Sequence, residues 1–201
     1  MKNLDIDARG CACPEPVVLT NQALETPGVH RVIVCVDNEN ARDNVSRMVK
    51  RKGCAVTVAE KESGIYELRI TKEQISVSAP GERAPAAPPV QDAVVYLFDA
   101  DYIGSNRDLG KVLVNGFLKA ALAHAESRGA VVLLSNGVRL ATEGSYALEV
   151  MRQMEAGGFR ILICGTCLDF FKIRQKVKIG TISNALEILE CMTAAGKVVK
   201  F

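Results

Sequence analysis

The sequence carries almost no excess of charge, because 25 lysine and arginine residues stand against 23 aspartate and glutamate residues. A net charge of +2 gives no electrostatic support for binding to nucleic acid or to a membrane surface. No apolar run approaches the ~18 residues that a membrane-spanning helix needs. The opening residues MKNLDIDARG also lack the apolar segment of a secretory signal. We therefore expect a cytoplasmic protein that binds neither nucleic acid nor membrane.

Histidine is scarce as well, since only His30 and His124 occur and neither lies near a candidate nucleophile in the sequence. A cysteine–histidine dyad therefore has little support. Cysteine, in contrast, occurs seven times. In a reducing cytoplasm, cysteine pairs are more often catalytic or metal-binding than structural disulfides. The cysteines are thus the first candidates for a functional site.

The chain divides at a segment that is rich in proline and alanine. Residues 78–92, SAPGERAPAAPPVQD, contain four of the seven prolines, and such a composition predicts a semi-extended linker rather than part of a core. We expect a first domain over residues 1–73, a linker over residues 74–92 and a second domain over residues 93–201.

Both domains are predicted to be of the α/β class. The first shows the order strand, helix, strand, helix, strand, strand, which predicts a two-layer βαβαββ sandwich. In the second, the apolar segments AVVYLFDA, AVVLLSN and FRILIC alternate with helical patterns. This alternation predicts a three-layer α/β/α domain with a mostly parallel sheet. Its chemistry is expected at the carboxyl ends of the strands, in residues 99–106, 135–140 and 164–170.

Two further local predictions concern the second domain. GSNRDLG, residues 104–110, is expected to cap a long helix through Ser105, Asn106 or Asp108 rather than to bind a nucleotide. A second helix is expected from Thr142 or Glu143 to Glu155. The segment SNGVRLATEGS, residues 135–145, lies at the carboxyl end of a strand and is expected to help form the wall of a pocket.

The segment CPEP places a thiol beside the start of a helix. Pro14 and Pro16 fit the first turn, where a helix tolerates proline, so Cys13 falls at or next to the N-cap. There, free N–H groups and the positive end of the helix dipole would favour a thiolate. Such a thiolate could attack a sulfane sulfur or carry it as a persulfide. The competing interpretation is a small buried cysteine at a strand–helix turn.

Residues 6–16, IDARGCACPEP, resemble the signature of the TusA-like (SirA-like) family of sulfur carriers. The matching residues are Asp7, Arg9, Gly10, Cys13, Pro14 and Pro16. The resemblance implies that Cys13 carries sulfur as a persulfide. Cys11 departs from the pattern, because family members usually have an apolar residue there. It either replaces that residue or acts as a second thiol that resolves a persulfide on Cys13.

Cys164 and Cys167 form the motif CGTC at the end of an apolar strand, a moderately specific signal for a redox pair of lowered pKa. The order of elements in residues 93–201 resembles the DsrE-like fold. That resemblance implies that Cys164 carries sulfur, that Cys167 is its partner thiol, and that a homo-oligomer could form through this domain.

The two halves together resemble the YedF family of sulfurtransferase-like proteins of selenium metabolism. This resemblance implies a carrier that accepts sulfur or selenium on Cys13 and relays or releases it with Cys164 and Cys167. The expected partners are a donor such as a cysteine desulfurase and a downstream acceptor protein. No cofactor is expected beyond the covalent persulfide or perselenide. The alternatives are a non-enzymatic adaptor or regulator of this metabolism, and a thiol–disulfide oxidoreductase that uses only CGTC.

Two other interpretations of these residues stay open. Four cysteines could bind zinc or an iron–sulfur cluster, although C-x-C is poor spacing for a structural zinc site; they are Cys11, Cys13, Cys164 and Cys167. Four basic residues follow CGTC and form either a solvated face or an electropositive lip that attracts anions; they are Lys172, Arg174, Lys176 and Lys178. The remaining cysteines are expected to be core residues: Cys35, Cys54 and Cys191.

Overall fold

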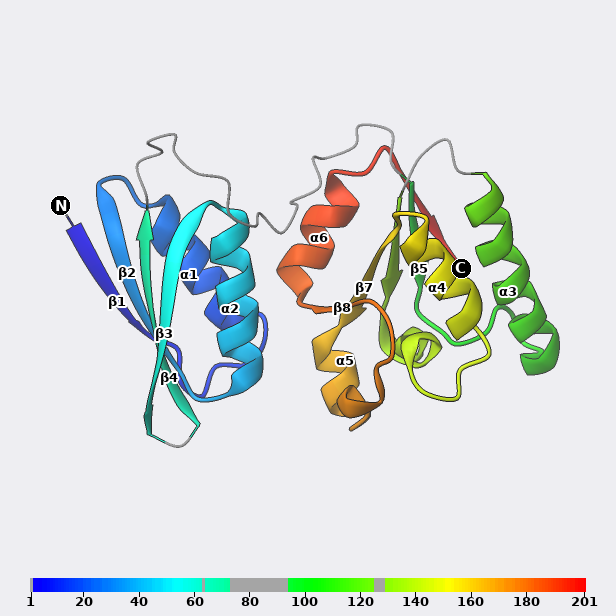
Figure 1. Ribbon diagram of the computed structural model, residues 1–201, viewed down its shortest axis with the longest axis horizontal. Coiled ribbons are helices and arrows are strands. Elements are labelled where there is room, and N and C mark those ends of the chain that lie inside the picture. Colours follow the sequence, from blue (N-terminus) through cyan, green and yellow to red (C-terminus); the bar gives the residue numbers. More distant parts are fainter. Residues whose placement is uncertain (1, 63, 73–93, 125–128) are drawn as a thin grey trace. The chain divides into compact units, whose positions relative to one another are not determined.

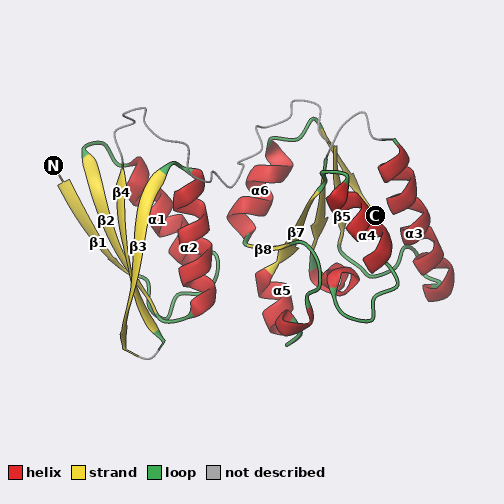
Figure 2. Ribbon diagram, viewed as in Figure 1, coloured by secondary structure: helices red, strands yellow, loops and turns green. Residues whose placement is uncertain are grey.

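The computed structural model describes residues 2–62, 64–72, 94–124 and 129–201. The chain forms two compact units, Met1–Ala86 and Ala87–Phe201. The linker predicted for residues 74–92 lies outside the described residues. Both units are α/β, as predicted, and Figures 1 and 2 show helices packed on a sheet in each.

The first unit contains four strands and two helices in the predicted order. They are β1 (Lys2–Asp7), α1 (Glu15–Glu25), β2 (Val29–Val36), α2 (Glu39–Arg51), β3 (Cys54–Glu62) and β4 (Ile65–Lys72). The sheet order is β1-β2-β4-β3, with β1 and β2 parallel and the other pairs antiparallel. Both helices cover the same face of this sheet (Figure 1), so the predicted two-layer sandwich is confirmed.

Strand β2 lies in the middle of this sheet. It ends next to the loop of residues 8–14, which contains Cys13 and is the candidate carrier loop. Its alternating valines Val32, Val34 and Val36 are fully buried, which is the pattern of a strand with one face on a core. The parallel pairing of β1 with β2 runs to Asp7 opposite Cys35. The carboxyl ends of both strands therefore meet at one edge of the sheet, and the loop toward α1 starts there.

The second unit contains five strands, four α-helices and two short 3₁₀ helices among the residues described. They are β5 (Val94–Phe98), α3 (Arg107–Ala123), β6 (Ala130–Leu133), η1 (Ser135–Ala141), α4 (Leu148–Ala156), β7 (Arg160–Cys164), α5 (Gly165–Phe170), η2 (Arg174–Lys176), β8 (Thr181–Ser183), α6 (Ala185–Thr193) and β9 (Lys197–Lys200). None of the described helices is both long and apolar enough to cross a membrane.

The strands of the second unit form one parallel sheet in the order β8-β7-β6-β5-β9. Its central strands are apolar and buried on both faces: all four residues of β6 are buried. Figure 1 shows α6 on one face of the sheet and α3 and α4 on the other. The predicted three-layer arrangement is confirmed. Asn106 caps α3 by accepting a hydrogen bond from the N–H of Leu109 at 3.0 Å, as one of the predicted alternatives has it.

The helix predicted from Thr142 or Glu143 to Glu155 is wrong at its start, because α4 begins only at Leu148. Thr142 instead pairs with Val177 in an isolated β-bridge, and its hydroxyl donates to the carbonyl of Arg139 at 2.8 Å. Gly144 has a φ of 80°, in the left-handed region that interrupts a helix. The helical pattern of the sequence therefore included residues that form a turn around Gly144 and not a helix.

Candidate functional site

The first candidate thiol lies immediately before α1. Cys13 is exposed, Pro14 is the N-cap residue and the helix begins at Glu15. Pro16 occupies the second helical position and is buried. The predicted position of Cys13 beside the helix start is therefore confirmed, and its sulfur is accessible to a partner protein.

The helix start does not offer the free N–H groups that the sequence led us to expect. Pro16 has no N–H, and the N–H groups of Glu15 and Val17 donate to the carbonyls of Ala12 and Pro14 at 2.9 and 3.0 Å. These donors are thus absent or already bonded to backbone. What remains for a thiolate at Cys13 is the general field of the helix dipole, which is screened at an exposed position.

An ion pair fixes the beginning of the loop that carries Cys13. The Arg9 side chain donates to both carboxylate oxygens of Asp7, at 2.8 and 2.6 Å, and the Arg9 N–H donates to the same carboxylate. These hydrogen bonds lower the pKa of Asp7 to about 2 and raise that of Arg9. Both side chains are more than half exposed, so the pair orients the loop and contributes little to stability.

A second carboxylate, which the sequence analysis did not identify, holds the same loop from β2. The N–H of Gly10 donates to Asp37 Oδ2 at 2.6 Å, and Asn38 Nδ2 donates to Asp37 Oδ1 at 3.0 Å. Both bonds lower the pKa of Asp37. Gly10 has a φ of 73°, in the left-handed region that favours glycine, and this turns its N–H toward the strand end.

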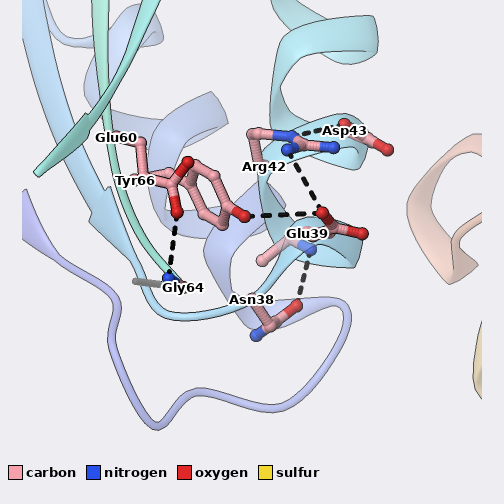
Figure 3. A network of polar contacts seen from close by, with 8 residues as sticks. Asn38, Glu39, Arg42, Asp43, Glu60, Gly64 and Tyr66 are labelled. Atoms are coloured by element: carbon pink, nitrogen blue, oxygen red, sulfur yellow. Dashed lines mark hydrogen bonds and ion pairs between the residues drawn. The ribbon is translucent and has the colours of Figure 1, made fainter. Parts of the chain in front are cut away.

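The start of α2 keeps Asn38 in place beside Asp37. Asn38 caps the helix by accepting a hydrogen bond from the N–H of Ala41 at 2.8 Å. Figure 3 shows Tyr66 reaching from β4 to the first turn, where its hydroxyl donates to Glu39 at 3.5 Å. Arg42 lies 4.7 Å from the centre of the Tyr66 ring. These contacts join the sheet to the helix that supports the carrier loop.

We expect Asp37→Ala to loosen the carrier loop without unfolding the domain. The N–H of Gly10 loses its protein acceptor but can bond to water, because the loop is exposed. Amide hydrogen exchange at Gly10, measured by NMR, should become several-fold faster than in the unmodified chain. Asp5→Ala is the matched control, since it removes the same charge from an exposed position on β1. Unchanged exchange in Asp37→Ala would contradict the assignment.

The same contact should depend on pH. The folded-state pKa of Asp37 lies below its unfolded value, so its stabilising contribution is present above the ordinary aspartate pKa of about 3.9. It is lost as the pH falls below that value and through the lowered pKa. The protection of Gly10 against exchange should therefore stay constant from neutral pH down to mildly acidic pH and decrease only below it.

Cys11 lies in the same loop but differs from Cys13 in its surroundings. It is half-buried, and its burial together with the charge of Glu15 and a hydrogen bond to that carboxylate raises its pKa. A raised pKa keeps the thiol protonated at neutral pH, and a protonated thiol is a poor nucleophile. The partial burial of Cys11 and its raised pKa therefore argue against a role as resolving thiol.

The second candidate site lies at the carboxyl edge of the parallel sheet, as predicted. Cys164 ends β7 and Cys167 follows one turn later in α5. Cys164 is the N-cap residue of α5 and Cys167 lies three residues later in the same turn, so the two thiols are neighbours, as thiol–disulfide exchange requires. The N–H of Ser135, the first residue of η1, donates to Cys167 Sγ at 3.2 Å. Segment 135–145 thus contacts this site through Ser135, and the pocket wall expected from it stays a prediction.

The prediction of a lowered pKa is wrong for Cys164. Only 8% of this residue is exposed, and burial raises its pKa. Backbone hydrogen bonds from Cys167 and Thr166 act in the opposite direction but do not outweigh the burial. The sequence placed Cys164 correctly at a strand end but could not show that the end of this strand lies inside the core.

The basic residues after CGTC are partly neutralised. Arg174 donates to both oxygens of Asp169 at 2.7 and 3.0 Å, and Lys178 lies 3.8 Å from Glu143. Arg174 also lies against the backbone of Gly165, where an added Cβ would meet its Nη2 at 2.9 Å. Arg174 therefore lies next to the CGTC segment, but its charge is paired with that of Asp169. The pairing favours a solvated face over an open electropositive lip.

The other interpretations of the cysteines have different outcomes. In the part of the chain that the structure describes, no group of three or more histidine, cysteine, aspartate or glutamate residues is arranged to hold a metal ion.

The core cysteines predicted from the sequence, Cys35, Cys54 and Cys191, are each only half-buried. Each lies toward the end of a strand or helix, where neighbouring elements cover a side chain incompletely.

The carboxylate of Asp37 and the N–H of Ser135 were not predicted from the sequence, for different reasons. Asp37 follows β2 directly, so a carboxylate at the carboxyl end of a strand next to the carrier loop was a usable signal. The donor at Ser135 is a backbone N–H, which every residue except proline has, so the residue type does not indicate it. Only the structure brings it to Cys167.

Comparison with known proteins assigns the first unit. The sequence profile of the family described as Sulfurtransferase TusA matches residues 4–72. Among solved structures, a SirA-like protein from Desulfitobacterium hafniense is 36% identical, covers 34% of this chain and 95% of its own, and has a TM-score of 0.32. No curated protein sequence matches the chain.

Two further solved structures cover the larger part of this chain at low identity. The YchN protein from E. coli is 19% identical over 56% of this chain and 100% of its own, with a TM-score of 0.42. A protein of unknown function from Methanobacterium thermoautotrophicum, MTH1491, is 18% identical over 55% and 100%, with a TM-score of 0.45. The family match, by contrast, covers the strands, the helices and the loop around Cys13 described above. Residues 4–72 therefore belong to the TusA family and form a TusA/SirA-like sulfur-carrier domain.

Proposed function

We propose that the chain is a sulfurtransferase-like carrier on which Cys13 accepts a sulfane sulfur or selenium atom as a persulfide or perselenide. The observation that carries the proposal is the exposed Cys13 at the start of α1, within a TusA/SirA-like domain. The β1 side of its loop is held by two contacts, the Asp7–Arg9 pair and the bond from Gly10 to Asp37. An accessible thiol on a fixed loop suits transfer between two partner proteins.

The loading step needs only a thiolate and a donor persulfide. The Cys13 thiolate attacks the outer sulfur of a donor R–S–SH, a new S–S bond forms, and the donor's S–S bond breaks. The donor leaves as the thiol R–SH, and the sulfur stays at the same oxidation level on Cys13. No external oxidant or reductant takes part. A cysteine desulfurase, which carries such a persulfide, is the proposed class of donor.

We assign the next step to the CGTC pair. Cys164 and Cys167 lie close together and can form a disulfide, so they can receive the sulfur or release it as hydrosulfide. Because both thiol sites are on one chain, the second acts at a high effective concentration. The resemblance to YedF proteins supports selenium as the cargo, with perselenide and hydroselenide as the corresponding species. The acceptor is then a protein of selenium or sulfur metabolism.

The direct test is loading of the full chain. The reduced protein is incubated with a cysteine desulfurase and either cysteine or selenocysteine, and its peptides are mapped by mass spectrometry without reduction. We expect the mass of one added sulfur or selenium atom on the peptide that contains Cys13. Chain without desulfurase is the control. No added atom, or an atom found only on other peptides, would refute the carrier function.

A second function is favoured by one observation, the placement of Cys164 and Cys167 three residues apart in the first turn of α5. A close dithiol could reduce disulfides of other proteins without any role for Cys13. In that case Cys13→Ala would retain all reductase activity, and the loading experiment would show nothing on the Cys13 peptide. The two results together separate an oxidoreductase from a carrier.

A further inference from the structure

The two thiols of the CGTC pair differ in access. Cys164 ends β7 and is only 8% exposed, as part of the core cluster of the second unit. Cys167 is packed against that cluster but is half-buried, so a reagent or a partner thiol can reach it. Thiol exchange requires attack along the S–S axis of the donor, which a sulfur inside the core cannot make on a bulky partner. Access therefore distinguishes the two cysteines.

Both sulfurs accept backbone hydrogen bonds. The N–H groups of Thr166 and Cys167 donate to Cys164 and do not outweigh its burial, whereas the half-buried Cys167 has a donor of its own. The N–H of Ser135 points at Cys167 Sγ at 3.2 Å, and such a donor stabilises negative charge on the sulfur that accepts it. Burial, and to a lesser extent the neighbouring Cys167 thiol, raises the pKa of Cys164. Burial therefore disfavours the thiolate of Cys164, and Cys167 is the more exposed sulfur of the pair and has a backbone donor aimed at it.

The backbone around Ser135 is held so that this donor keeps its direction. Ser135 has a φ of 45°, an uncommon conformation for a residue other than glycine. The preceding N–H of Leu134 donates to the carbonyl of Phe98 at 3.0 Å. Gly137 packs directly against the same carbonyl, where a Cβ would not fit. The strained residue therefore sits between two contacts to β5 and presents its N–H to Cys167.

We propose that Cys167, and not Cys164, is the thiol of CGTC that attacks an incoming sulfur donor, and that Cys164 is the resolving thiol. This order is the reverse of the one that the resemblance to the DsrE-like fold implied. It rests on the proposed function only for the nature of the cargo, because the order of the thiols can be measured with small reagents. A persulfide sulfur or a mixed disulfide would then form on Cys167.

The chemistry balances with the two thiols and one external dithiol. The Cys167 thiolate attacks the outer sulfur of R–S–SH, and R–SH leaves. The Cys164 thiolate, after its proton is lost to solvent, attacks Cys167 Sγ, and the bond from Cys167 to the carried sulfur breaks. That sulfur leaves as HS⁻ with two electrons more, and the pair becomes a Cys164–Cys167 disulfide. A dithiol reductant of the cell then reduces the disulfide and restores both thiols.

The first test measures the two reactivities in the unmodified full chain. The reduced protein is treated with iodoacetamide for increasing times under native conditions, then denatured and treated with isotope-labelled iodoacetamide. Mass spectrometry of the CGTC peptide gives the rate at each cysteine. We expect Cys167 to react about tenfold faster than Cys164, or more, because Cys167 is half-buried whereas Cys164 is only 8% exposed. Equal rates, or a faster Cys164, would overturn the proposal.

The second test traps the mixed disulfide with dithiodipyridine. In the unmodified chain, attack by Cys167 and displacement by Cys164 should give a Cys164–Cys167 disulfide. In Cys164→Ser the pyridylthio group should stay on Cys167, whereas Cys167→Ser should form no stable adduct on Cys164 in the same time. The opposite pattern would refute the order. Cys191→Ala, which changes a half-buried cysteine of α6, is the matched control and should behave like the unmodified chain.

The outcomes separate this proposal from the proposed carrier function. Loading of Cys13 by a desulfurase is independent of which CGTC thiol attacks first. A faster Cys164 together with normal loading of Cys13 refutes only the order of the thiols. A fast Cys167 without loading of Cys13 refutes the carrier function and leaves the order standing. A persulfide found on Cys167 in Cys164→Ser after loading would support both.

Discussion

Cys13→Ser is expected to abolish sulfur loading of the first domain, down to the background seen without desulfurase. A serine hydroxyl is protonated at neutral pH and does not attack a sulfane sulfur, whereas a cysteine ionises in part and does. The loss should be a loss of chemistry and not of folding, because Cys13 is exposed. Mass spectrometry of the loaded protein measures the effect, and a thermal unfolding curve that matches the unmodified chain verifies the fold.

Cys11→Ser is the matched control for this prediction, since it changes a thiol two residues away in the same loop. Cys11 is half-buried and its pKa is raised, so the variant should still load most of the sulfur that the unmodified chain accepts. The role of Cys13 would be refuted if Cys13→Ser loads normally. If Cys11→Ser were the variant that fails, the carrier thiol would be Cys11.

Gly137→Ala is expected to destabilise the second domain strongly. The added Cβ would overlap the carbonyl oxygen of Phe98 and lie 2.9 Å from its carbonyl carbon, and both are backbone atoms of a buried strand. Overpacking usually costs about 1–3 kcal/mol, and a clash with fixed backbone should reach the upper end of that range. Hydrogen exchange of peptides from residues 94–201 in increasing urea gives the free energy of unfolding of this domain.

The control for this prediction is Gly116→Ala on α3, where an added Cβ meets no atom within 4 Å. A glycine in a helix is less stable than alanine by up to about 1 kcal/mol, so this variant should be unchanged or slightly stabilised. Gly137→Ala should also slow the reaction of Cys167 with dithiodipyridine, because a shifted η1 no longer directs the N–H of Ser135 at its sulfur. Two variants of equal stability would contradict the packing of η1.

Much of the fold follows from patterns that act locally. Apolar runs such as Val94–Phe98 and Arg160–Cys164 predict buried parallel strands, and the helices between them follow from their periodicity. The positions of Cys13 beside a helix start and Cys164 at a strand end came from the same reasoning. These predictions hold because each depends on residues a few positions apart.

What could not be predicted depends on contacts between segments far apart in the sequence. The bond from Gly10 to Asp37 joins residues 27 positions apart, and that from Ser135 to Cys167 joins residues 32 positions apart. The burial of Cys164, which reverses its expected pKa shift, is likewise a property of the packed sheet. The late start of α4 shows that a local pattern can also mislead, because the helical pattern of the sequence continued through a turn at Gly144.

Pro14 and Pro16, at the start of α1, have a consequence for how firmly Cys13 would hold a sulfur atom. Because the first N–H groups of the helix are missing or already bonded to backbone, a terminal sulfur on Cys13 gains little specific solvation from the protein. A site that bound the anion tightly would lower the energy of the loaded state and so raise the barrier to its departure. In the proposed carrier, an exposed sulfur without dedicated donors would be neither strongly stabilised nor strongly destabilised by the protein. If Cys13 carries sulfur as proposed, the concentrations of its partners would then set the direction of transfer.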